Sequence, residues 1–153
     1  MRLYLVQHGE ARSEAEDPTR PLMEKGRTEV RRVAAAAQKL AVSPVKILHS
    51  GKLRAQQTAE LFAEALHPSK GVEAASGLSP NDPVQPWAEW LSQQEEDLML
   101  VGHLPHLDRL TSLMLCHNEQ AGVIRFRYGA VVCLEREGAH WAVQWILTPD
   151  ISR

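Results

Sequence analysis

The chain has 153 residues and a formal net charge of −2, with basic and acidic residues interspersed along it. This length fits a single domain, residues 1–153, whose core is large enough to fold without a disulfide framework. The charge pattern argues against a nucleic-acid-binding face, and no apolar run approaches the roughly 20 residues of a membrane span. We therefore expect a cytoplasmic monomer without nucleic-acid or membrane partners.

The apolar pattern predicts strands that alternate with helices. Short apolar runs at 3–6, 45–48 and 98–101 predict buried strands, and a helical pattern follows each of them. The predicted helices cover about 24–40, 53–66 and 105–116, with a shorter one at 84–94 that follows a weak strand. On the first helix the spacing predicts an inward stripe of Val30, Val33, Ala34, Ala37 and Leu40.

The C-terminal part of the chain has a different pattern. Segments 123–128, 130–135 and 141–147 look like strands, with a turn at Glu137 and Gly138 between the last two. The whole order predicts a three-layer α/β/α sandwich. Its sheet should be mostly parallel, with antiparallel strands near the C-terminus.

Polar, basic or small residues follow each of the three apolar strands. They are Gln7, His8 and Gly9 after the first, Ser50, Lys52 and Arg54 after the second, and Gly102 and His103 after the third. Ligands of open α/β sheets bind beyond the carboxyl ends of the strands, so these side chains should share one rim.

Histidines, arginine and helix N-termini together suit a phosphate group. A neutral imidazole is a competent nucleophile toward phosphorus, and nearby positive charge should lower its pKa. Gly9, which has no Cβ, should let a substrate approach His8 closely. The chain has no GxSxG elbow, Walker loop, HExxH or glycine-rich dinucleotide motif.

Four segments in order, "QHGEA", "RPLMEKG", "HSGKLRAQQTA" and "VGHLP", resemble the histidine phosphatase superfamily. The match extends from residue 1 to about 147 and is nearest to the small phosphohistidine phosphatases of the SixA type, with a phosphoglycerate-mutase-like fold. The resemblance implies that His8 is the phosphorylated nucleophile. It also implies that Arg20 and Arg54 bind the phosphoryl group and that His103 stabilises it.

The sequence departs from the family pattern at three positions. Gln7 stands where the family has arginine, Met23 where a threonine usually caps the next helix, and Gly51 where proline is common. Gln7 should bind phosphate as a weaker, neutral donor and lower the rate. Met23 predicts a weaker helix cap.

We expect a metal-independent phosphatase without cofactors that acts on phosphohistidine of a signalling or phosphotransfer protein. The chain between Arg54 and His103 is too short for a helical lid, so the site should be open. Two alternatives stay open: a phosphate-binding relative with little turnover because of Gln7, and a phosphatase of small phosphoesters.

Glu10 is either a proton donor or a solvated loop carboxylate. Both cysteines, Cys116 and Cys133, should be buried and reduced.

Overall fold

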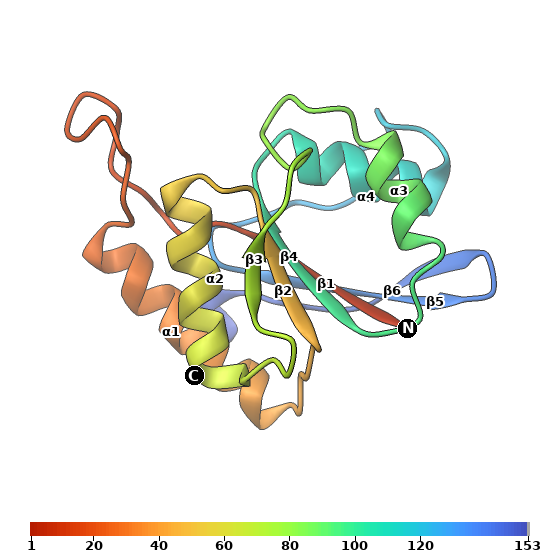
Figure 1. Cartoon of the computed structure of the whole chain (residues 1–153), viewed down its shortest axis with the longest axis horizontal. Coiled ribbons are helices and arrows are strands. Elements are labelled where there is room, and N and C mark those ends of the chain that lie inside the picture. Colours follow the sequence, from red (N-terminus) through yellow and green to blue (C-terminus); the bar gives the residue numbers. More distant parts are fainter. Residues whose placement is uncertain (153) are drawn as a thin grey trace.

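A computed structural model describes residues 1–152 and contains one six-stranded sheet in the order β3-β2-β4-β1-β5-β6 (Figure 1). The strands are β1 (Arg2–Gln7), β2 (Lys46–His49), β3 (Val72–Ala74), β4 (Leu98–Gly102), β5 (Val131–Glu137) and β6 (His140–Leu147). The helices are α1 (Glu24–Lys39), α2 (Leu53–Leu66), α3 (Gln85–Leu91), α4 (His106–Cys116) and the 3₁₀ turn η1 (Pro149–Ile151). Strands β1 to β4 are parallel, while β5 and β6 are antiparallel, as predicted.

Helices cover both faces of the sheet, which confirms the three-layer prediction. Helices α1 and α2 pack together on one face, and α3 and α4 on the other (Figure 1). Alternate residues of β1 face the two layers: Tyr4 and Val6 join the core under α1 and α2, and Leu3 and Leu5 join the other.

The predicted stripe of α1 is buried except at its end. Val30, Val33, Ala34 and Ala37 are fully enclosed, but Leu40 is 59% exposed because it is the C-cap residue, where the chain leaves the helix. Met23 is the N-cap of α1 and makes no side-chain capping hydrogen bond, which confirms the weaker cap.

The predicted strand at 123–128 is wrong. Ile124 and Phe126 are buried in the α3–α4 layer, which accounts for the alternating pattern. Strands β4 and β5 occupy both edges of β1, so this segment does not pair along β1. Only Tyr128 forms an isolated bridge, to Gln7.

The two cysteines differ in environment. Cys133 is buried in β5, whereas Cys116, the last residue of α4, is exposed, so the prediction for Cys116 is wrong.

Between α2 and β4 the only regular elements are β3 and α3. No helix within residues 1–152 combines the length and apolar character needed to span a bilayer.

Candidate active site

The register of three neighbouring strands brings the candidate residues together. Gln7 of β1 lies opposite Gly102 of β4, and His49 of β2 lies opposite Val101 of β4. The next residue of β1 is His8, whose backbone N–H donates to the Gly102 carbonyl at 3.0 Å. The rings of His8 and His103 are consequently 5.0 Å apart between centroids.

The hydrogen bonding of His8 determines which of its ring nitrogens is free. Its Nδ1 lies 2.7 Å from the Gly9 carbonyl oxygen. Because a carbonyl can only accept, Nδ1 carries the proton and Nε2 keeps its lone pair. No residue in 1–152 forms a hydrogen bond with Nε2. His8 therefore presents a free nucleophilic nitrogen at the rim of the sheet.

Burial keeps His8 neutral. Burial, followed by the positive charges of Arg54 and Arg20, lowers the pKa of His8 to about 4. The sequence predicted the direction of this pKa shift from nearby cations, but desolvation is the larger cause. At neutral pH the imidazole is uncharged and able to attack phosphorus.

Arg54 lies in the first turn of α2, and its Nε–H is a buried donor without a partner in the described chain. Such an orphan donor is rare in folded proteins and suggests a ligand. Burial and then the charge of Arg20 lower the pKa of Arg54, which puts the two guanidiniums in one neighbourhood. The Arg20 backbone has a positive φ of 49°, and its Nε–H donates to the Arg12 carbonyl at 3.0 Å.

His103 is 1% exposed and contacts Ser50, the residue that follows β2. Its Nε2 lies 2.6 Å from the Ser50 hydroxyl oxygen, while its Nδ1 is buried without a partner. Burial, followed by the charges of His8 and Arg54, lowers the pKa of His103 to about 3. His103 is therefore neutral, and it adds a second orphan nitrogen to the site beside Arg54.

The family model described as histidine phosphatase superfamily (branch 1) matches residues 3–79. The chain belongs to this superfamily. An uncharacterized protein of Picosynechococcus sp. (strain ATCC 27264 / PCC 7002 / PR-6) is 35% identical over 147 residues, which cover 85% of this chain and 87% of that protein.

Solved structures of other proteins share the fold. The protein histidine phosphatase SixA complexed with tungstate matches with a TM-score of 0.87 and 23% identity, over 98% of each chain. The alpha-ribazole phosphatase from Shigella flexneri matches with a TM-score of 0.78 and 15% identity, over 97% of each chain. Membership of the histidine phosphatase superfamily supports phosphatase activity.

In this histidine phosphatase, Gly9 allows close packing against α1. The prediction that the missing Cβ lets a substrate approach His8 is wrong. A Cβ at Gly9 would lie 2.8 Å from Val30 Cγ2 of α1 and 3.3 Å from the Gly26 carbonyl oxygen. The Gly9 N–H donates to Thr58 Oγ1 at 2.9 Å, and that hydroxyl donates to the Arg54 carbonyl at 2.8 Å. Sequence reasoning missed this role of Thr58, although the threonine ends the "LRAQQT" motif. These contacts hold the residue after His8 against the first turn of α2.

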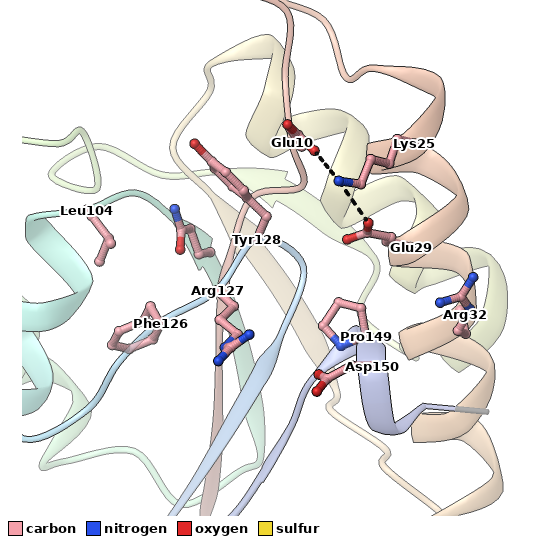
Figure 2. A pocket seen from close by; sticks show the side chains of 11 residues that line it. Glu10, Lys25, Glu29, Arg32, Leu104, Phe126, Arg127, Tyr128, Pro149 and Asp150 are labelled. Atoms are coloured by element: carbon pink, nitrogen blue, oxygen red, sulfur yellow. Dashed lines mark ion pairs between the residues drawn. The ribbon is translucent and has the colours of Figure 1, made fainter.

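Gln7 lies beside a cavity of about 690 Å³, which we call the side groove (Figure 2). The groove is lined by residues of three regions: Gln7 and Glu10 with Lys25, Glu29 and Arg32 of α1; Leu104 with Phe126, Arg127 and Tyr128; and Pro149 and Asp150 of η1. The Gln7 side chain is thus part of the groove wall.

Tyr128 is a residue that the sequence did not indicate, because it was assigned to a strand. Its ring centroid is 5.6 Å from that of His8, and the residue is 44% exposed. Gly129 has a backbone φ of 73°. Its N–H donates to the Gln7 carbonyl at 2.9 Å, and this hydrogen bond holds the neighbouring Tyr128 beside β1. The glycine after Tyr128 was the available signal for this turn.

The Glu10 carboxylate forms an ion pair with Lys25 at 3.5 Å, and Lys25 also pairs with Glu29 at 3.8 Å. Glu10 lines the side groove, so its assignment as proton donor stays a prediction. Within residues 1–152 no group of three or more His, Cys, Asp or Glu side chains is arranged to hold a metal ion.

Proposed function

We propose that this chain removes the phosphoryl group from phosphohistidine on a protein, through a phosphohistidine intermediate on His8. The observation that carries the proposal is the hydrogen bond from His8 Nδ1–H to the Gly9 carbonyl, which leaves Nε2 unprotonated. In the first step the Nε2 lone pair forms a bond to phosphorus, and the bond from phosphorus to the substrate imidazole breaks. The departing imidazole nitrogen takes a proton from water.

In the second step water attacks the phosphorus of the intermediate. The bond from phosphorus to His8 Nε2 breaks, inorganic phosphate leaves, and the proton lost by the water passes to solvent. Neutral His8 is restored with its proton on Nδ1.

The buried nitrogens of the site are suited to hold the phosphoryl oxygens during both steps. Arg54 Nε and His103 Nδ1 have no partner in the described chain, and Arg20 adds a second positive charge. Donors that are preorganised around a developing anion supply much of the rate in such reactions. We infer that these groups do the work that a metal ion does elsewhere. SixA, which shares the fold, was solved with tungstate, a tetrahedral oxyanion like phosphate.

An open site supports a protein substrate over a small metabolite. Between α2 and β4 the described chain has only β3 and α3, and neither is a helical insertion long enough to form a lid. We propose that residues 1–153 form one domain without such a lid. A phosphorylated side chain on a protein surface can reach such a site directly.

Gln7 supports a second candidate function. The residue is neutral and lines the side groove. A chain that lacks one cation at this position could bind phosphohistidine and turn it over very slowly.

Mass spectrometry of the intact protein tests the proposal. Rapid quenching after mixing with a chemically phosphorylated histidine protein should give one added phosphoryl group, located on His8. The proposal is wrong if the protein hydrolyses this substrate and no phosphoenzyme forms under any quench. Binding without hydrolysis would favour the second candidate.

A further inference from the structure

We propose that the side groove binds an acidic stretch of polypeptide next to the phosphohistidine of the substrate, and that Arg32 and Arg127 select it. The inference rests on the proposed function in one respect, that the phosphorylated group belongs to a protein.

The groove begins beside His8, the proposed nucleophile. Gln7 lines it and is the chain neighbour of His8, and Tyr128 lines it with its ring 5.6 Å from the His8 ring. A polypeptide whose phosphohistidine is placed at His8 can therefore continue past Tyr128 into the groove.

The cavity is larger than the reaction needs. Its volume of about 690 Å³ exceeds that of a phosphoryl group and an imidazole ring. The volume lies within the range that is usual for ligand-binding pockets. Leu104, Phe126 and Tyr128 form an apolar wall on one side, and α1 forms a charged wall on the other (Figure 2). This combination suits a peptide segment, which has both apolar and polar parts.

The charges of the groove are unevenly paired. Its acidic residues are occupied: Glu10 and Glu29 both pair with Lys25, and Asp150 accepts from the Thr148 hydroxyl. By contrast, the guanidiniums of Arg32 and Arg127 make no ion pair or hydrogen bond within residues 1–152. The groove therefore offers a ligand two guanidiniums that are not engaged elsewhere in the described chain.

The lining also argues against a polyanion. It contains three basic residues, Lys25, Arg32 and Arg127, and three acidic ones, Glu10, Glu29 and Asp150, so the formal charges cancel. A nucleic acid or an anionic membrane needs an excess of positive charge. Carboxylates of a peptide can instead bind the two unpaired guanidiniums, whose planar N–H groups match the geometry of a carboxylate.

The two arginines come from different parts of the fold. Arg32 is on α1, while Arg127 is in the segment that leads into β5, and Figure 2 shows them on opposite sides of Pro149 and Asp150. Two such anchors on separate walls define a direction across the groove, which gives selectivity for a segment rather than for one side chain.

The chain offers a matched control for the test. Arg31 is the neighbour of Arg32 on α1 and is also exposed, but it does not line the groove. Arg31→Glu and Arg32→Glu change the net charge equally. Any difference between them therefore isolates the groove from the long-range field.

The probes are two fluorescein-labelled peptides that each have one histidine, flanked by glutamates in one and by lysines in the other. Fluorescence anisotropy measures binding of the unphosphorylated peptides. Chemical phosphorylation of the histidine then gives substrates whose kcat/KM is compared with that of free phosphohistidine. We expect the wild type to prefer the acidic peptide by about five-fold or more in both measurements. Arg32→Glu and Arg127→Glu should remove that preference, and Arg31→Glu should retain it.

The inference is overturned if the wild type binds both peptides equally, or if Arg32→Glu behaves as Arg31→Glu does. Faster hydrolysis of free phosphohistidine than of either peptide would also overturn it, because the groove would then serve a small substrate. If no substrate is hydrolysed but the binding preference and its loss in Arg32→Glu persist, the proposed function fails and the groove assignment holds.

Discussion

The rings of His8 and His103 lie 5.0 Å apart because β1 and β4 pair in parallel with Gln7 opposite Gly102. The two residues are far apart in the sequence and adjacent at the sheet rim. Burial is the main cause that lowers the pKa of each, and the positive charge of Arg54 acts on both imidazoles. The neutral histidines keep a nucleophilic nitrogen, and the arginines supply the positive charge near it.

The first prediction concerns His8 as the nucleophile. His8→Ala should reduce hydrolysis of phosphohistidine to the uncatalysed rate and abolish the phosphoenzyme seen by mass spectrometry. Its far-UV circular dichroism should match that of the wild type. His67→Ala, at the exposed C-cap of α2, is the control and should keep both activities. Normal turnover by a folded His8→Ala protein would reject the mechanism.

The second prediction concerns the orphan Nε–H of Arg54. Arg54→Lys keeps the charge but loses the fork, so kcat/KM should fall on the order of 10²-fold. Since this donor has no partner in the described chain, its loss should cost the folded state little. Steady-state kinetics and thermal unfolding together check this, with Arg31→Lys as the control. A large loss of stability with unchanged kcat/KM would make Arg54 a structural residue.

The third prediction concerns pH. The folded pKa of His8 is about 4, so kcat/KM should stay level from pH 7 to about 5 and fall as protonation blocks Nε2. Unfolded His8 has a pKa of about 6.5 and binds protons that folded His8 does not. The free energy of unfolding should therefore be greatest above pH 6.5 and should decrease as the pH falls toward 4. A kcat/KM profile that drops at pH 6.5 would contradict the buried environment of His8.

The fourth prediction concerns Gln7. Gln7→Arg should raise kcat by roughly 10-fold or more if the transition state gains a charge-assisted hydrogen bond. An inactive wild type with an active Gln7→Arg variant would identify the natural protein as a phosphate-binding relative. Equal rates would mean that another cation already supplies the charge. Arg12 is one candidate, although it pairs with Glu16 at 3.7 Å.

The fifth prediction concerns metal ions. We expect hydrolysis to survive exhaustive treatment with EDTA, because arginine and histidine nitrogens supply the electrostatic stabilisation. The rate is compared before and after chelation and after each divalent ion is added back. Loss of activity on chelation that one divalent ion restores would refute the proposal.

Much of the fold could be predicted from local pattern. The apolar runs at 3–6 and 98–101 lie within β1 and β4, and the stripe on α1 is buried from Val30 to Ala37. The segment 123–128 was mispredicted because alternation reports burial of alternate side chains, which Ile124 and Phe126 satisfy without a partner strand. Whether a strand forms depends on which strand edges the segment reaches in the fold, and β4 and β5 occupy both edges of β1.

The sequence by itself determined which residue types follow each strand, and so which ones could meet at the rim: His8, Arg54 and His103. Only the tertiary structure decided which nitrogen of His8 is free, since that depends on a 2.7 Å contact with a carbonyl. It also decided that Gly9 packs against α1 and that the Tyr128 ring lies beside His8 and lines the side groove. Periodicity reports the face on which a side chain lies, whereas these features depend on distances between segments far apart in the chain.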